Sequence, residues 1–208
     1  AIDLFCGLGG WTEGLLAEGY DVIGFDIERH VYGDMKYPAQ LVIQDVLTLH
    51  GRQFKDATLI VASPPCQAYS YRAMPWKRAK ALPPPDNSLF EACSRIQREA
   101  SEAAGRKIPM VVENVRGAQK WVGPAAWHYG SFYLWGDVPA LMPWTNPAEN
   151  GSKQPGISGP RNNGKGDAWF QDGAARHGSK SNARKMASAM IAKIPLPLSR
   201  HIAAVYKP

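Results

Sequence analysis

A chain of 208 residues with 45% hydrophobic and 20% charged residues suits a single globular domain with a substantial core. No apolar run is long enough to span a membrane, and no segment reads as a signal peptide. The three cysteines, Cys6, Cys66 and Cys93, are widely spaced without a C-x-x-C pair. This spacing argues against a disulfide framework or a structural zinc site and fits a reducing cytoplasm. The net charge of +6 is compatible with a polyanionic partner.

The first two-thirds of the chain alternates strand-like and helix-like segments. The helical spacing of Leu89, Cys93 and Ile96 predicts a helix that ends at Gly105, and another helix is expected shortly after the first strand. Continuous apolar strands separated by helices are typical of a parallel sheet covered on both faces, so we predict a doubly wound α/β fold. The apolar runs predict strands at residues 2–5, 21–27, 41–43, 58–62 and 110–112.

Two segments interrupt this alternation. Residues 67–87 form a loop rich in aromatic and basic residues and in proline, and a loop of this length is usually functional. Residues 143–184 contain seven glycines and four prolines, and their six Lys or Arg against three Asp or Glu give a local charge of about +3. We expect residues 185–208 to return to the core as a helix, an extended turn at Pro195–Pro197 and a final helix. The chain is therefore predicted to be one domain, 1–208, with a basic insert.

The segment "DLFCGLGG", residues 3–10, lies between the first predicted strand and its helix, where open α/β sheets bind ligands. Its glycines have the spacing G-x-G-G, which meets neither the dinucleotide fingerprint nor the P-loop pattern, so a purely structural turn stays an alternative. The next two strands end near Asp26 and Asp45, and either acid alone could be a helix N-cap. Ligand-type residues at three successive strand ends together predict a nucleotide-type cofactor site.

A second motif, "SPPCQAYS" at residues 63–70, follows the fourth predicted strand. Cys66 within it is either a nucleophile or an ordinary loop thiol. A nucleophile needs a lowered pKa or a nearby proton handler, since a free thiol titrates near about 8.5. Glu113 ends the fifth predicted strand and would lie beside Cys66 if the two strands are neighbours, although it could also be a salt-bridged or capping carboxylate. A cysteine and a glutamate beside a nucleotide-type site predict attack on an electron-poor ring.

The motifs "DLFCGLGG", "SPPCQAYS" and "ENV" (residues 113–115), in this order and spacing, resemble the signature motifs of DNA cytosine-5 methyltransferases. The resemblance extends from residue 1 to about residue 136 and resumes near the end of the chain. It implies a Rossmann-like catalytic domain, S-adenosylmethionine as methyl donor and double-stranded DNA as substrate. It also implies a monomer without a metal in the cytoplasm of a bacterial or phage-infected cell, with restriction–modification as one possible role.

Carried over residue by residue, the resemblance fills the predicted cofactor site. Phe5 would stack on the adenine, Gly7 and Gly9 would leave room for the methionine part, and Asp26 would hold the ribose hydroxyls. Asp45 with Val46 would hold the adenine, and Leu89 would pack on it. The full set of cofactor-binding residues that the resemblance implies is Asp3, Phe5, Gly7, Leu8, Gly9, Gly10, Asp26, Ile27, Asp45, Val46, Pro64 and Leu89.

The resemblance also implies the catalytic set. Cys66 would add to C6 of a flipped-out cytosine, and Glu113 would hydrogen-bond N3 and the exocyclic amine of that ring. Pro65, Gln67 and Asn114 complete this set. The loop after Gln67 is interpreted as a lid that closes over DNA, its alternative being a solvated surface loop. The residues assigned to DNA binding are Ser70, Arg72, Lys77, Arg78 and Arg116.

The sequence departs from the family pattern in three places. The arginine that contacts the cytosine in the family is missing from "WHYG" (residues 127–130), so His128 or Arg116 would take its place. The family's cofactor-contacting asparagine near the chain end is replaced by Ala192. Residues 143–184 stand where the family has a target-recognition domain and are too short for a separate module. We therefore expect a recognition site of about two to four bases, or a segment that orders on DNA.

We favour a compact DNA cytosine-5 methyltransferase, and two other functions stay open at the level of the sequence. The same chemistry could act on RNA or on a free nucleotide. Alternatively, the chain could be a degenerate module that binds cofactor and DNA without turnover. The presence of Cys66 and Glu113 argues against this last interpretation, whereas the missing arginine keeps it open.

Overall fold

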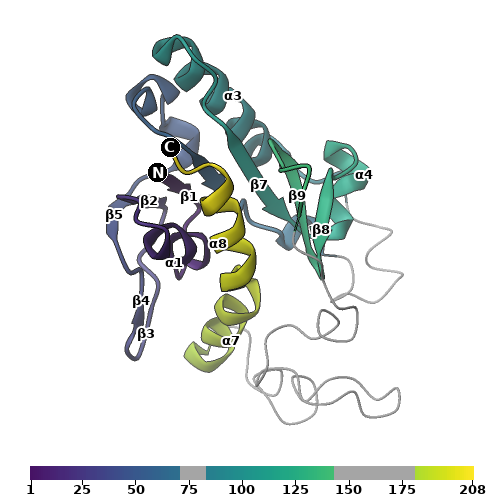
Figure 1. Ribbon diagram of the computed structural model, residues 1–208. Helices are drawn as coiled ribbons and strands as arrows, with labels where there is room; N and C mark the ends of the chain where they lie inside the picture. The colour runs from purple at the N-terminus through teal and green to yellow at the C-terminus, as the bar shows by residue number, and fades with distance from the viewer. Residues whose placement is uncertain (71–82, 143–180) are drawn as a thin grey trace.

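A computed structural model describes residues 1–70, 83–142 and 181–208 of the chain, which are the coloured parts of Figure 1. Most of the predicted insert at residues 143–184 lies outside these residues, as does most of the predicted lid. The description of the fold that follows concerns the described residues only.

Seven short strands form one sheet in the order β5-β2-β1-β6-β7-β9-β8. The first five strands in this order run parallel, and β9 and β8 are antiparallel additions at one edge. The five predicted strands make up the parallel part, which confirms the doubly wound, mostly parallel, Rossmann-like fold. The strands are β5 (Gln40–Ile43), β2 (Ile23–Asp26), β1 (Ile2–Leu4), β6 (Ile60–Ala62), β7 (Met110–Asn114), β9 (Phe132–Gly136) and β8 (Trp127–Tyr129).

Each face of the sheet buries its own hydrophobic core, because the side chains of a strand alternate between the two faces. Ile60 and Val112 pack with Ile96 in one core, whereas Val61 and Val111 belong to the other. Figure 1 shows the two helices of this second core on the near side of the sheet. The covering helices are α3 (Ser88–Ala104) on the first face, and α1 (Gly10–Ala17) with α8 (Leu196–Val205) on the second.

Helix α1 packs closely on α8 because Gly14 has no side chain. A Cβ atom at Gly14 would lie 2.4 Å from the backbone nitrogen of Arg200, far inside van der Waals contact. Two ion pairs add to this contact: Arg200 Nε lies 2.6 Å from Glu18 Oε1, and Lys193 Nζ lies 2.5 Å from Glu13 Oε1. The C-terminal segment is therefore held against the first helix, next to the glycine turn.

The C-terminal segment differs from its prediction in two places. Helix α7 (Asn182–Ala192) begins inside the predicted insert, because the Ser181 hydroxyl caps it by accepting a hydrogen bond from the N–H of Arg184 at 3.2 Å. The predicted extended turn at Pro195–Pro197 is shorter than expected: Pro195 is extended, but α8 begins at Leu196 and includes Pro197 in its first turn. Proline is tolerated there because the first N–H groups of a helix have no acceptor within the helix.

Several short elements were not predicted, because they are too short to carry a periodic pattern. These unpredicted elements are β8, described above, and β3 (Val31–Tyr32), β4 (Met35–Lys36), η1 (Val46–Thr48), η2 (Gly51–Phe54), η3 (Gln67–Tyr69), η5 (Arg116–Ala118) and α4 (Gln119–Val122).

Within the described ranges, no helix combines the length and the apolar character needed to cross a membrane.

Candidate functional site

A cavity of about 350 Å³ lies where the parallel strands β1, β2 and β6 end. The chain order of the sheet reverses between β1 and β6, and open α/β sheets bind ligands at such a switch point. The volume is in the range of small-molecule sites, roughly 300–1,000 Å³. Nine of the predicted cofactor-binding residues line the cavity: Phe5, Gly7, Leu8, Gly10, Asp26, Ile27, Asp45, Val46 and Leu89.

Phe5 follows β1 directly and lines the cavity, and its backbone conformation is unusual. Its φ angle of +57° is in the left-handed region, which strains a residue with a bulky side chain. Gly7 and Gly9, at +50° and +78°, adopt the same region without this strain. Strained non-glycine residues concentrate at ligand sites, so the backbone of Phe5 itself points to a bound ligand.

Asp26, at the end of β2, provides a negative charge in this wall. Its carboxylate accepts hydrogen bonds from the N–H groups of Gly7 at 2.9 Å and Glu28 at 3.3 Å, and His30 Nε2 lies 3.5 Å from it. Burial alone would raise the pKa of Asp26, but the hydrogen bonds from His30, Gly7 and Glu28 lower it below its ordinary value. The group is therefore charged at neutral pH, and its oxygens retain lone pairs for hydroxyl donors of a ligand.

Asp45, after β5, combines the two roles that the sequence left open. Its Oδ1 caps η1 by accepting a hydrogen bond from the N–H of Leu47 at 2.9 Å, and the residue also lines the cavity. The buried Val46 and the half-buried Leu89 give this end of the cavity an apolar surface. The wall thus offers acceptors at two strand ends and apolar area between them.

Three predicted cofactor-binding residues, Asp3, Gly9 and Pro64, are not part of the lining. Asp3 is buried, and its Oδ2 accepts a hydrogen bond from Thr12 Oγ1 at 2.6 Å, whereas Oδ1 has no hydrogen-bond partner among the described residues. Burial raises the pKa of Asp3 to about 7. A Cβ atom at Gly9 would lie 2.5 Å from Pro38, so this glycine permits the close packing beneath the turn. Asp3 and Gly9 thus support the structure around the site without lining the cavity.

Cys66 lies in the turn after β6, and its neighbours Pro65 and Gln67 line the cavity. Cys66 is half-buried, forms no disulfide and accepts a hydrogen bond at its carbonyl from the N–H of Tyr69 at 3.0 Å. The buried Tyr69 donates its hydroxyl to Asn87 Oδ1 at 2.8 Å, which ties the turn to the start of α3. The cysteine is therefore held next to the cavity by a defined turn.

Glu113 is the penultimate residue of β7 and lies on the strand next to the one that precedes this turn, as predicted. Strands β6 and β7 are parallel neighbours with Ala62 opposite Val112, so the following residues, Ser63 and Glu113, are adjacent. Glu113 is 8% exposed, and its burial raises the pKa to about 8, although a hydrogen bond from Ser63 opposes this shift. At neutral pH the Glu113 side chain is mainly a neutral acid, which can donate a hydrogen bond.

Asn114 fastens the end of β7 to the cysteine turn. Its Nδ2 donates a hydrogen bond to the Pro64 carbonyl at 2.9 Å, and its Oδ1 accepts one from the N–H of Val115 at 2.8 Å. Asn114 is only 1% exposed, so water does not compete for these bonds. Because Pro64 and Asn114 are close in sequence to Cys66 and Glu113, this contact brings the turn and the acid together.

The cavity has further lining residues that the sequence did not single out. Cys6 and Ser63 belong to the two main motifs, Trp11 directly follows the first motif, and Glu28 and His30 are close to Asp26 in sequence, so their positions were a signal that could have found them. The C-terminal lining residues depend on contacts across the fold, because they lie about 180 residues from the glycine turn. Ala192, the residue that the resemblance aligns with the family's asparagine, is also in the lining. The unpredicted lining residues are Cys6, Trp11, Glu28, His30, Ser63, Ala189, Lys193 and Ile194.

The predicted DNA contacts are described only in part. Arg72, Lys77 and Arg78 lie outside the described residues. Ser70 is half-buried after η3, and Arg116 is exposed on η5. In the part of the chain that the structure describes, no group of three or more His, Cys, Asp or Glu side chains could hold a metal ion.

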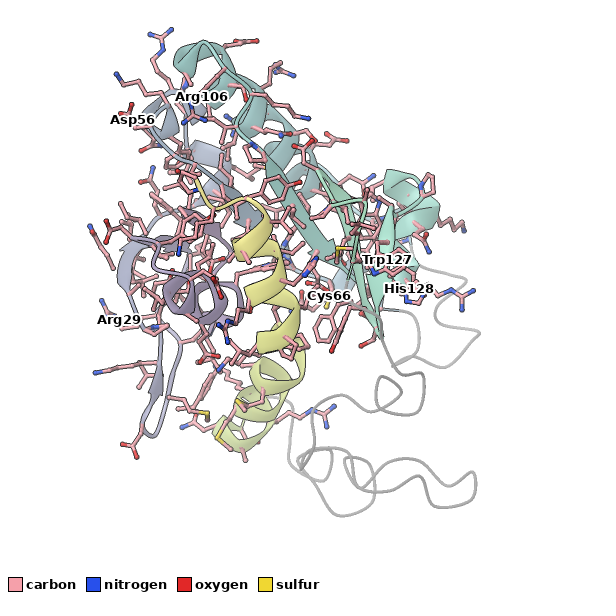
Figure 2. All side chains as sticks on the ribbon, in the orientation of Figure 1. Arg29, Asp56, Cys66, Arg106, Trp127 and His128 are labelled. Atoms are coloured by element: carbon pink, nitrogen blue, oxygen red, sulfur yellow. The ribbon has the colours of Figure 1, made fainter. Side chains whose placement is uncertain are left out.

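The strand pairing connects His128 on β8 to the end of β7, which is next to the cysteine turn. Its ring stacks on Tyr133, with centroids 5.0 Å apart and planes at 18°. His128 is paired with Tyr133, and Tyr133 with Asn114, so the three side chains follow one another on one face of the sheet. Figure 2 shows Cys66 and His128 at the same end of the molecule, with Asp56 and Arg106 at the opposite end.

A protein-family model described as C-5 cytosine-specific DNA methylase matches residues 1–121. No curated protein sequence matches the chain. Solved structures that resemble it include a DNA modification methyltransferase encoded within a prophage of E. coli. That structure is 26% identical over 58% of this chain and 33% of its own, with a TM-score of 0.40.

Two further solved structures are more distant. The Dnmt2 methyltransferase of S. pombe is 18% identical over 57% of this chain and 35% of its own, with a TM-score of 0.37. The methyltransferase EhMeth of Entamoeba histolytica is 19% identical over 57% of this chain and 38% of its own, with a TM-score of 0.39. The matched region thus spans between 33% and 38% of the length of these three structures.

Proposed function

Because the chain belongs to the C-5 cytosine-specific DNA methylase family, we propose that it transfers a methyl group from S-adenosylmethionine to C5 of cytosine in double-stranded DNA. The observation that carries this proposal is the joint position of Cys66 and Glu113. The hydrogen bond from Asn114 to Pro64 joins the segments that carry these two residues, next to a cavity of cofactor size that Pro65 and Gln67 line. A thiol, a neutral acid and a ligand cavity in one place are the parts that covalent activation of a pyrimidine ring requires.

The chemistry of the cavity wall suits this cofactor. The charged Asp26 offers acceptors to the two ribose hydroxyls, and Asp45 offers one to the adenine amine. Phe5 and Leu89 offer apolar surface to the flat adenine ring. When bound, S-adenosylmethionine supplies a methyl group made electrophilic by its positively charged sulfur.

Cys66 supplies the activation that C5 of cytosine lacks. Its thiolate forms a bond to C6, and the electron pair of the C5–C6 double bond becomes available at C5. Glu113, as a neutral acid, donates its proton to N3, which compensates the negative charge that addition brings to the ring. Its other oxygen accepts a hydrogen bond from the exocyclic amine.

After methyl transfer the ring is restored by the reverse movement of electrons. The C5 proton passes to a water molecule, its electron pair re-forms the C5–C6 double bond, and the Cys66–C6 bond breaks to release the thiolate. Glu113 recovers its proton from N3 at this stage. Each turnover therefore returns both side chains to their starting protonation states.

We propose that the chain acts as one catalytic domain and binds DNA as a monomer. The target cytosine must leave the base stack to reach Cys66. The basic loop at residues 67–87 and the basic segment at residues 143–184 are the candidates for contacts with the phosphate backbone, and the charge of +6 supports a polyanionic substrate. His128, at the cysteine end of the sheet, is our candidate for the family's missing arginine.

The proposed function is tested by measuring its product, 5-methylcytosine. The purified chain is incubated with S-adenosylmethionine and either random-sequence DNA or RNA, and 5-methylcytosine is measured by nucleoside mass spectrometry. We expect product in DNA, no product with Cys66→Ala, and a rate lowered by roughly 100-fold or more with Glu113→Gln, since glutamine cannot transfer a proton. Product in RNA alone would reassign the substrate, and no product in either polymer would refute the activity.

A further inference from the structure

A hydrogen-bonded pair of residues connects the cavity wall to Glu113. Trp11 Nε1 donates a hydrogen bond to Ser63 Oγ at 3.0 Å, and both residues line the cavity. Trp11 is 2% exposed and belongs to the core that α1 shares with α8, where the contact at Gly14 fixes the helix position. The indole N–H therefore has a fixed location, and the Ser63 hydroxyl accepts its hydrogen bond.

The chemistry of this pair determines where the Ser63 proton points. An indole N–H can only donate, whereas a hydroxyl has one proton and two lone pairs. Because Ser63 accepts from Trp11 on one side, its own proton is free to go to another acceptor. The acceptor that the strand register offers is Glu113, which follows Val112 as Ser63 follows Ala62, and a hydrogen bond from Ser63 is among the influences that lower the pKa of Glu113.

We propose that Ser63, oriented by Trp11, is a positioning residue that fixes which carboxyl oxygen of Glu113 carries the proton. The inference rests on the proposed function of Glu113. The oxygen that accepts from Ser63 is the carbonyl oxygen of the neutral acid, so the acidic proton is on the other oxygen. That second oxygen is the one that must face N3 of the cytosine.

The same hydrogen bond acts again once the proton has moved. Glu113 is then a buried carboxylate, and the Ser63 hydroxyl remains as a donor to it. Without Ser63, the charged form of Glu113 would be left in a desolvated site, and the proton would be harder to release. Ser63 thus assists both the orientation of the acid and the transfer of its proton.

The direct test follows the titration of Glu113 itself. We would record carboxyl ¹³C NMR spectra of glutamate-labelled protein against pH, for the unmodified chain, Ser63→Ala, Ser63→Thr and Trp11→Phe. Losing a donor to the carboxylate raises the pKa of Glu113, so Ser63→Ala should move the midpoint upward. Ser63→Thr retains the hydroxyl and should restore the midpoint, and Trp11→Phe should fall between the two. A midpoint unchanged in Ser63→Ala would overturn the proposal, whether or not the chain has activity.

The methylation rate supplies the second readout. Glu113 must be protonated to act, so activity falls as pH rises through its pKa, and Ser63→Ala should shift this alkaline limb upward and lower the maximal rate by about 10-fold. The exposed Ser94→Ala on α3 is the matched control and should leave both unchanged. A merely structural role of Ser63 would lower the rate with the limb unmoved and without rescue by threonine. An unmodified chain that makes no 5-methylcytosine would refute the proposed function, and the NMR titration would still decide the role of Ser63.

Discussion

Phe5 is the residue whose own conformation carries information about function. Its φ of +57° costs free energy, roughly 1–3 kcal/mol for a non-glycine residue, and Phe5 lies in the cavity wall, packed against the edge of one hydrophobic core. A strained aromatic side chain at this position is well suited to stack on a flat ring. In the proposed function, Phe5 would therefore link the backbone of the glycine turn to recognition of the cofactor.

Replacing Phe5 separates this strain from stacking. Phe5→Gly removes both the strain and the ring, whereas Phe5→Leu keeps the strain and removes only the ring. We expect both variants to bind S-adenosylmethionine about 10-fold more weakly in calorimetry, because stacking on a base is worth about 1–3 kcal/mol. The melting temperature should fall less for Phe5→Gly than for Phe5→Leu. A Phe5→Gly variant with unchanged affinity would show that the ring does not contact the cofactor.

The parallel strands could be predicted from sequence because they are buried on both faces. Their apolar runs, such as residues 58–62 and 110–112, need no partner to be recognised. Helix α3 was equally clear, since its buried residues recur at helical spacing and Gly105, with a φ of +65°, ends it. The glycine turn and the strand-end acids Asp26 and Asp45 followed from the same pattern, because the ends of parallel strands converge.

Other elements could not be predicted, because their position depends on tertiary contacts. Strand β8 is three residues long at the sheet edge and exposes Trp127 and His128, so it has no alternating pattern. The start of α7 depends on a single cap at Ser181. In the site, the hydrogen bond between Trp11 and Ser63 joins residues 52 apart, and no local pattern contains such a pairing.

At the scale of the whole molecule, the cavity is closed by the two ends of the chain. The family model ends at residue 121, yet Ala192 and Lys193 line the same cavity as the glycine turn. Lys193 reaches this place through its ion pair with Glu13 in α1 and is largely buried there, with 19% of its side chain exposed. The cavity thus includes residues outside the region that the family model matches.

The role of Lys193 can be separated from that of its ion pair. Lys193→Met removes a cation from the cavity wall, and we expect S-adenosylmethionine, whose methionine part carries a carboxylate, to bind about 5-fold more weakly. Glu13→Gln breaks the same ion pair at a residue outside the lining and should change affinity less than about twofold, because such partly exposed pairs contribute little. Equal losses in the two variants would assign the effect to the ion pair.

The central claim, covalent catalysis by Cys66, is tested most directly by trapping the adduct. A DNA duplex containing 5-fluorocytosine has no C5 proton to lose, so the bond between Cys66 and C6 cannot break after methyl transfer. Intact-mass spectrometry with S-adenosylmethionine present should find one covalent protein–DNA complex, and peptide mapping should locate it at Cys66. Cys93→Ala is the matched control, since Cys93 is fully buried and its pKa is raised to about 12. Covalent catalysis by Cys66 requires an adduct with the unmodified chain and with Cys93→Ala but none with Cys66→Ala; an adduct that persists in Cys66→Ala, or none on any target, would refute it.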